Sequence, residues 1–141
     1  MATLEEIVIT YVAAWAQIDE EERRALLEKS WADAGIYIDP TAEVVGREAL
    51  LRHIERYHQQ FAGHRILCTS GVDEHHSRFR FTWVLLNPEG NQVSEGMDFG
   101  EVGPDGRLIR ITGFFGPPPP LPSSWPADLT LSNEQTNGNG D

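Results

Sequence analysis

The sequence has a single cysteine, no long run of apolar residues, and only half as many basic as acidic side chains, 11 against 22. Cys68 has no second cysteine to pair with, so an internal disulfide is excluded, which fits a reducing compartment. The longest basic stretch is Arg23-Arg24 and the net charge is −11, which disfavours binding to nucleic acid or to an anionic membrane.

Membrane and metal sites have little support in the sequence. Glu5 and Glu6 interrupt the N-terminal apolar residues, so we expect neither a signal peptide nor a membrane span, and we predict a cytoplasmic protein. His75 and His76 are adjacent, with no HxH or HxxxH spacing, and are interpreted as a solvated turn pair rather than zinc ligands. We expect no metal and no cofactor.

Three helices are indicated by apolar residues at helical spacing. Residues 4–18 follow Thr3 as a candidate N-cap, a second helix follows Asp19 as another, and a third helix covers about residues 47–61. Between the last two lies a short strand, 36–39, which Pro40 stops. A further strand is expected over residues 65–72, followed by a turn at 73–76.

The stretch from residue 78 to residue 116 is typical of three antiparallel strands joined by short turns. The strands are rich in aromatic and β-branched residues, and the turns are Asn87-Pro88-Glu89-Gly90 and Pro104-Asp105-Gly106. At 141 residues the chain is long enough for one domain with a real core. We therefore predict an α+β fold in which a cone-shaped, curved antiparallel sheet wraps around three N-terminal helices and encloses a pocket. The domain is assigned to residues 1–116, and 117–141 to a Pro-rich arm with a disordered end.

Asp98 is a carboxylate in the middle of a predicted strand, where it is unfavourable unless it has an interaction partner or a functional role. With a four-residue loop at 88–91, Asp98 lies opposite Phe81 and shares its face with Phe79, Trp83 and Leu85. A loop one residue shorter would turn Arg78, Arg80 and Thr82 to that face instead. We prefer the first register because four large apolar groups belong on a buried face. Burial would then raise the pKa of Asp98, whereas the alternative is a solvated carboxylate on an open sheet face.

The order of these elements resembles that of the nuclear transport factor 2-like (NTF2-like) superfamily over residues 4–116. Two features are similar to ketosteroid isomerases and SnoaL-like polyketide cyclases: Trp31-Ala32-Asp33 through Asp39-Pro40, and Asp98 eight residues before Gly106. The resemblance implies that Asp39 stands at the position of a proton-shuttling base. It also implies that Asp98 stands at that of a protonated acid that donates to an oxyanion.

The sequence departs from the isomerases at two positions, Trp15 and His53. Trp15 stands where the resemblance places their oxyanion-hole tyrosine, while Tyr11 lies one turn earlier and His53 lies on the third helix, where it can orient Asp39 or donate a proton. These departures point away from steroids and toward proton transfer on another apolar, carbonyl- or epoxide-bearing molecule. We expect Asp39, nearer the pocket mouth, to keep a pKa close to normal.

These observations give one functional prediction with one alternative. The prediction is an enzyme that isomerises, cyclises or dehydrates a small apolar metabolite through Asp39, Asp98 and His53. The alternative is a non-catalytic ligand-binding or dimerising protein in which Asp39 caps a loop and Asp98 pairs with Arg80 or Arg110. Outward-facing Met97 and Phe99 leave an apolar sheet face, so we expect a homodimer through the sheet. The predicted pocket wall consists of Tyr11, Trp15, Trp31, Tyr37, Tyr57, Phe61, Phe79, Phe81, Trp83, Ile111 and Phe115.

Overall fold

The computed structural model describes residues 2–131. Within them the chain forms α1 (Leu4–Ala16), α2 (Glu20–Ser30), β1 (Trp31–Asp39), β2 (Ala42–Val45), α3 (Arg47–Gln60), β3 (Arg65–Cys68), β4 (Asp73–His75), β5 (Arg78–Leu86), β6 (Gln92–Val102) and β7 (Leu108–Phe115), followed by a 3₁₀ turn, Ala127–Leu129. The expectation of a disordered C-terminal end concerns residues 132–141, which lie outside the described residues.

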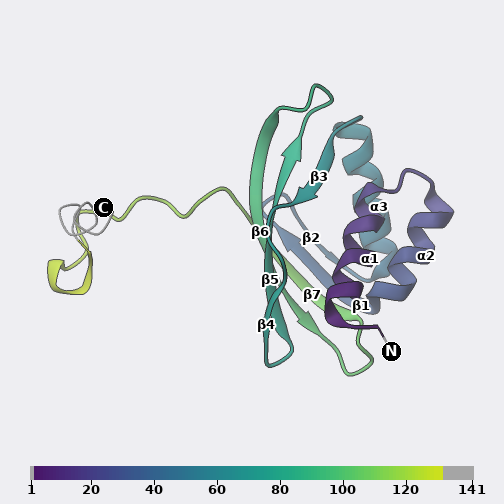
Figure 1. The fold of residues 1–141 in the computed structure, drawn as a ribbon, viewed down its shortest axis with the longest axis horizontal. Helices are drawn as coiled ribbons and strands as arrows, with labels where there is room; N and C mark the ends of the chain where they lie inside the picture. Colours follow the sequence, from purple (N-terminus) through teal and green to yellow (C-terminus); the bar gives the residue numbers. More distant parts are fainter. Residues whose placement is uncertain (1, 132–141) are drawn as a thin grey trace.

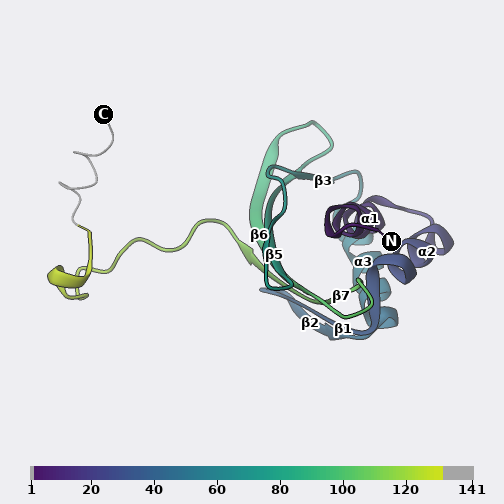
Figure 2. The same ribbon diagram turned by 60° about the horizontal axis from the view of Figure 1, so that its bottom comes forward.

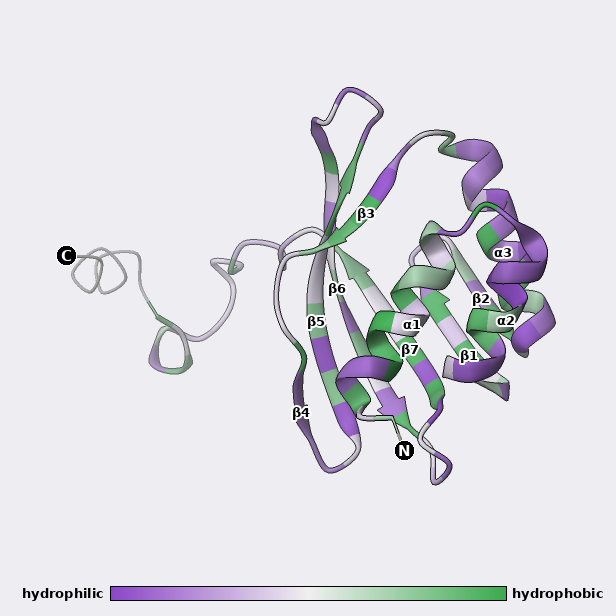
Figure 3. Cartoon of the chain, turned by 45° about the vertical axis from the view of Figure 1, so that its right-hand side comes forward, coloured by the Kyte–Doolittle hydropathy of each residue, from purple (hydrophilic) through white to green (hydrophobic). Residues whose placement is uncertain are grey.

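One curved sheet forms the body, with the three helices on its concave side (Figure 1, Figure 2). The strand order is β2-β1-β7-β6-β5-β3, and β4 pairs with β5 at the edge. In the hydropathy colouring of Figure 3, α1 is mostly hydrophobic, whereas α2 and α3 carry long hydrophilic stretches. The predicted α+β cone is confirmed, with one difference: β1 runs parallel to β7, so the sheet is mixed.

Both predicted N-caps are confirmed. The Thr3 hydroxyl oxygen accepts from the backbone N–H of Glu6 at 3.1 Å, and the Asp19 carboxylate accepts from that of Glu22 at 2.9 Å. Buried Arg23 then donates to the backbone carbonyls of Gln17 at 2.9 Å and of Ile18 just after it at 3.0 Å. These carbonyls follow the end of α1, so Arg23 fixes the turn between the first two helices.

The strands outside the central hairpin differ from the prediction in their bounds. β1 begins at Trp31 rather than at residue 36, with a register irregularity between Trp31 and Ile36, and β2 was not predicted. The expected strand over 65–72 ends at Cys68, and the expected turn at 73–76 contains β4. β2, β3 and β4 are only three or four residues long, and the burial pattern of β1 is interrupted by its irregularity, so none of their sequences shows the strict alternation that marks a half-buried strand.

The register of the central hairpin agrees with the preferred prediction, but for a different reason. Phe81 lies opposite Asp98 as expected. The loop, however, is one residue shorter than expected. The Asn87 N–H donates to the Asn91 carbonyl at 2.9 Å, which leaves only residues 88–90 in the loop, and Leu86 pairs with Gln92. Val93 is an extra, unpaired residue in β6, a β-bulge. Beyond it Leu85 pairs with Ser94, and all pairs farther from the loop are in the predicted register. The bulge therefore keeps Asp98 on the concave face.

The core fills the end of the cone that the helices cover. Trp31 and Ile111 have no exposed surface, and Trp31 stacks on Tyr11 with ring centroids 5.5 Å apart. Complete burial of one large apolar side chain contributes about 1.5–3 kcal/mol relative to exposure. The core residues with no exposed surface are Ala14, Leu27, Trp31, Leu50, Ile54, Leu108 and Ile111.

Beyond the sheet, the chain leaves the body at Gly116 (Figure 1). Among residues 2–131, none of the helices combines the length and the apolar character that crossing a membrane requires.

Candidate functional site

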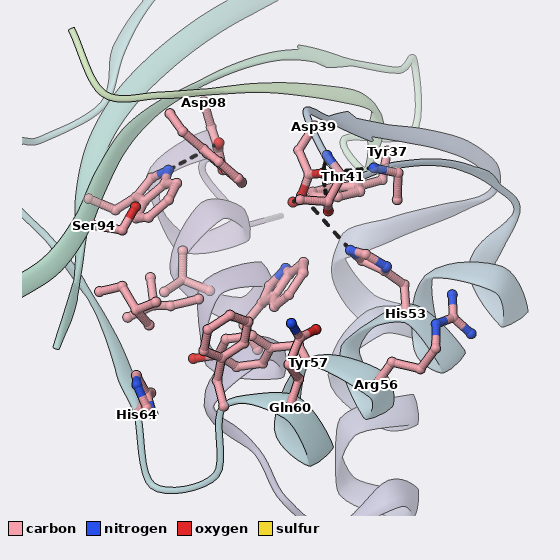
Figure 4. A pocket seen from close by; sticks show the side chains of 18 of the residues that line it. Tyr37, Asp39, Thr41, His53, Arg56, Tyr57, Gln60, His64, Ser94 and Asp98 are labelled. Atoms are coloured by element: carbon pink, nitrogen blue, oxygen red, sulfur yellow. Dashed lines mark hydrogen bonds and ion pairs between the residues drawn. The ribbon is translucent and has the colours of Figure 1, made fainter. Parts of the chain in front are cut away.

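A cavity of about 770 Å³ lies toward the turn of the β5–β6 hairpin, since Leu85, Val93 and Ser94 line it. Figure 4 shows the side chains of its wall. Its walls come from α1 and α3 on one side and from the concave face of the sheet on the other. A volume of this size suits a small organic molecule. Its lining is formed by Tyr11, Val12, Trp15, Tyr37, Asp39, Thr41, Ala42, His53, Arg56, Tyr57, Gln60, Phe61, His64, Ile66, Phe81, Trp83, Leu85, Val93, Ser94, Asp98 and Phe115.

Most residues that the sequence assigned to the site meet in this cavity. The three proposed catalytic residues line it together, as do eight of the eleven predicted wall residues. The other three, Trp31, Phe79 and Ile111, are buried in the core instead, and this part of the prediction is corrected. Strand alternation identifies the face of a residue but not its depth along the strand. Phe79 lies two residues beyond Phe81, away from the hairpin turn and under the helices.

The sequence reasoning missed a group of polar lining residues. Arg56 and Gln60 follow His53 at spacings of three and four along α3, so they belong to one helix edge, and His64 comes from the turn just past the helix. That spacing was the available signal. Thr41 and Ala42 come from the unpredicted β1–β2 turn, and Ser94 follows the unpredicted bulge.

Asp98 is a buried acid in an aromatic setting. Its residue is 8% exposed, and the carboxylate oxygen Oδ1 accepts a hydrogen bond from the indole N–H of Trp83 at 3.1 Å. Burial raises the pKa of Asp98 to about 7, partly offset by the Trp83 bond and assisted by the charge of Asp39. Both protonation states of Asp98 are thus accessible near neutral pH.

Asp39 is a carboxylate held in its charged form. Oδ2 accepts from the Tyr37 hydroxyl at 2.6 Å, and Oδ1 accepts from Thr41 (N–H at 2.7 Å, hydroxyl at 2.6 Å) and from the Ala42 N–H at 3.0 Å. Burial by itself raises the pKa of Asp39, but the nearby His53 ring and the donors of Thr41 and Tyr37 outweigh it and bring the pKa well below its usual range. The expectation of a nearly normal pKa is therefore corrected, because it did not foresee these donors.

His53 lies between Asp39 and the aromatic wall. Its Nε2 is 3.9 Å from Asp39 Oδ2, an ion-pair distance rather than that of a hydrogen bond. Its ring packs against those of Tyr37 and Trp15, with centroids 5.3 and 5.8 Å away. Figure 4 shows the His53 ring pointing at Asp39, while Asp98 faces the same cavity from the sheet. These contacts fix the orientation of the imidazole.

Tyr11 contributes a buried hydroxyl without a hydrogen-bond partner among the described residues. The side chain lines the cavity, and burial, together with the negative charge of Asp98, raises the pKa of Tyr11 well above its usual value. The phenol therefore stays protonated at neutral pH, as a donor that a bound molecule can use.

No group of three or more His, Cys, Asp or Glu side chains within residues 2–131 is placed to hold a metal ion. His75 and His76 lie at the β4–β5 turn, with their Nδ1 atoms 3.1 Å apart. They are remote from the cavity lining.

Comparison with known proteins identifies the class of fold through solved structures. Neither protein-family models nor curated protein sequences give a match. Among solved structures, an NTF2-like protein of unknown function from Cytophaga hutchinsonii shares 12% identity, covering 83% of this chain and 93% of that one with a TM-score of 0.62. A proposed polyketide cyclase from Sinorhizobium meliloti shares 18% identity over 76% of this chain and 92% of its own, with a TM-score of 0.61. These likenesses identify an NTF2-like cone.

A nearer relative narrows the class. A SnoaL-like family protein of Agrobacterium tumefaciens, proposed to be an isomerase, is 33% identical, with a TM-score of 0.77 over 82% of this chain and all of that one. The chain belongs to the SnoaL-like family of the NTF2-like superfamily. The fold alone does not determine an activity, which has to be argued from the site.

Proposed function

We propose that the protein is a cofactor-independent enzyme that moves a proton within a small apolar carbonyl compound, in an isomerisation, cyclisation or dehydration. The observation that carries this proposal is the pair of carboxyls in one cavity whose pKa values are pushed apart, Asp98 upward and Asp39 downward. Environments of this kind separate acid from base roles in proton-transfer sites.

Asp98 is the proton carrier in this proposal. Its carboxylate takes a proton from the carbon next to the substrate carbonyl, and the electron pair of the broken C–H bond moves to the carbonyl oxygen as an enolate. The resulting carboxylic acid returns the same proton to another carbon of the enolate, so no other reactant is consumed. A group with a pKa near the operating pH is suited to both steps, and such catalysis contributes about 10²–10⁴-fold in rate.

The other polar groups hold the charges in place. The Tyr11 hydroxyl donates to the enolate oxygen, since its proton has no other acceptor among the described residues. Asp39 is too weak a base to take the proton itself, and in this proposal it positions His53. The imidazole N–H of His53 then supplies a second donor to the substrate.

The proposal can be tested without knowing the natural substrate. The protein in D₂O would be mixed with 2-tetralone, a flat apolar ketone, and exchange of the protons next to its carbonyl followed by NMR. We expect exchange well above the buffer rate, with loss of most of the acceleration in Asp98→Asn. Asp33→Asn, an exposed acid on β1, is the matched control and should leave exchange unchanged. If exchange with the wild-type protein is no faster than exchange in buffer alone, the proposal is contradicted for this class of substrate.

The alternative, a non-catalytic ligand-binding protein, is favoured by the hydrogen bonds of Asp39. Its Oδ1 caps the turn between β1 and β2 through the N–H groups of Thr41 and Ala42, as a purely structural residue would. Asp98 has no ion pair with Arg80 or Arg110 among the described residues, and this supports the enzyme. Binding of the neutral fluorescent probe N-phenyl-1-naphthylamine without any proton exchange would indicate the alternative.

The expected partners are a small apolar molecule in the cavity and a second copy of the chain on the outer sheet face. The cavity supports the first through its aromatic walls. The second is supported by Phe99 and Phe114, which are 41% and 58% exposed and pack edge to face, 6.0 Å apart. Light scattering should give twice the chain mass of 15.8 kDa. The cytoplasmic location stays a prediction.

A further inference from the structure

Residues 117–131, called the C-terminal arm below, extend from the body with large apolar side chains exposed. Leu121, Trp125, Leu129 and Leu131 are 49%, 58%, 77% and 54% exposed. Figures 1 and 2 both show the arm leaving on the side of the sheet opposite the helices. A soluble chain rarely leaves apolar groups of this size gathered and uncovered without a partner.

The first residues of the arm direct the chain away from the folded domain of the same copy. Gly116 takes a left-handed backbone with φ 72°, and its N–H donates to the Glu95 carbonyl at 2.9 Å, which fixes the exit from β7. Four prolines follow at 117–120 and a fifth at Pro122. A polyproline II segment of six residues spans about 19 Å at 3.1 Å per residue, and its stiffness opposes folding back.

The end of the arm forms a small knob, residues 122–131. The Trp125 N–H donates to the Pro122 carbonyl at 3.2 Å, and the Leu129 N–H and the Thr130 hydroxyl donate to the Pro126 carbonyl at 3.1 and 3.0 Å. Three local hydrogen bonds without a core give little stability in water. The knob therefore needs an apolar surface to pack against. The proline-rich segment 117–122, the spacer, holds it away from the sheet of its own copy.

The sheet face from which the arm leaves is also uncovered. Phe99 and Phe114 are exposed on it with their rings in contact, Met97 pairs with Phe114, and Glu95 and Glu101 follow on the same face of β6. A two-fold symmetric dimer would bury both surfaces. The two exposed sheet faces would pack against each other, and the arm of each copy would pack on the other copy.

We propose that the C-terminal arm clasps a second copy of this chain, which is docked sheet to sheet on the face of Phe99 and Phe114. The inference rests on the homodimer proposed above. Packed sheets lie about 10 Å apart, so a spacer of about 19 Å crosses the gap and carries the knob onto the flank of the partner copy. Asp128 is the single charged residue of the arm, so the net charge of −11 on each copy repels it only weakly.

The first test is the dissociation constant of the dimer, measured on the full chain by sedimentation from about 0.1 to about 50 µM. Trp125→Ala should weaken the dimer at least about tenfold. Ser124→Ala alters an exposed polar neighbour in the same turn and should have no effect. Since Trp125 is exposed in the single copy, neither change should disturb the fold, which circular dichroism would check.

The second test shows whether the arm docks in trans. With 5-fluorotryptophan in the chain, the ¹⁹F signal of Trp125 is identified by its absence in Trp125→Ala. We expect this signal to move on dilution with the midpoint found by sedimentation. A dimer unaffected by Trp125→Ala would overturn the arm proposal and leave the dimer intact. A monomer at every concentration would overturn both, and a Trp125 signal shielded equally in monomer and dimer would show docking on its own copy.

Discussion

Gly113 makes room for the carboxyl of Asp98. The two residues are paired across β6 and β7, and a Cβ placed on Gly113 would lie 2.8 Å from Asp98 Oδ1 and 3.5 Å from the Cβ of Asp39. Gly113 thus lies between the two carboxylates that the proposal uses. Without a side chain there, the Asp98 carboxyl can rest against β7 while it accepts from Trp83.

Gly113→Ala should therefore impair the site more than the fold. The new methyl displaces a carboxylate that can rotate, so we expect an intact fold, loss of the Trp83 bond and at least about a tenfold fall in 2-tetralone exchange. Gly71→Ala is the control, because a Cβ there meets nothing within 4 Å. Exchange at the wild-type rate in Gly113→Ala would show that the position of Asp98 does not matter.

Trp83→Phe should raise the pH at which Asp98 ionises. The indole N–H stabilises the charged carboxylate, and phenylalanine keeps an aromatic ring against Phe115 but has no donor. The midpoint of the pH profile for exchange should move upward by about 0.5–1 unit. A midpoint that stays in place, or moves down, would contradict the assignment of this profile to Asp98.

The fold and the face of Asp98 could be predicted because they depend on local signals. Capping residues set the starts of α1 and α2, and alternation of Phe79, Phe81 and Trp83 identified the buried face of β5. The hairpin loop shows where such reasoning is limited. From the loop length alone the register would have been one residue off, and only the bulge at Val93 restores it.

The charge state of Asp39 could not be read from the sequence. It depends on Thr41 and Ala42, which reach its carboxylate because the chain turns back into β2, and β2 has no pattern of its own that marks a strand. Similarly, Trp31 reaches the core through an irregularity in β1 that a periodicity argument does not contain. Tertiary packing determines both.

Asp39→Asn should destabilise the protein at neutral pH. The folded-state pKa of Asp39 lies below the unfolded value, so its contribution to the free energy of unfolding is present above about pH 4 and is lost as the pH falls below that value. An amide cannot accept at both positions, and we expect a loss of about 1–3 kcal/mol in urea denaturation at pH 7. The gap to the wild type should narrow toward pH 3. A variant as stable as the wild type at pH 7 would mean that these bonds contribute nothing.

Asp98→Asn should show the opposite pH dependence. Because the folded-state pKa of Asp98 is raised, its folded form holds a proton between about pH 4 and pH 7 that the unfolded chain has released. The free energy of unfolding of the wild type should fall with pH over this window, relative to the variant, by up to about 1.4 kcal/mol per pH unit. Above pH 7 the variant should be the more stable protein. Parallel curves for the two proteins would contradict a buried acid.

The proposed role of Asp98 requires its carboxyl to gain and lose a proton near neutral pH, and titration of its side-chain carboxyl carbon measures this. In protein labelled with ¹³C at aspartate, the Asp98 signal is identified as the one missing from Asp98→Asn, and its chemical shift is followed with pH. We expect a midpoint near 7, because burial disfavours the charged form of this carboxyl. A midpoint near the ordinary value of about 4 would contradict it, because Asp98 would then be a plain carboxylate at neutral pH.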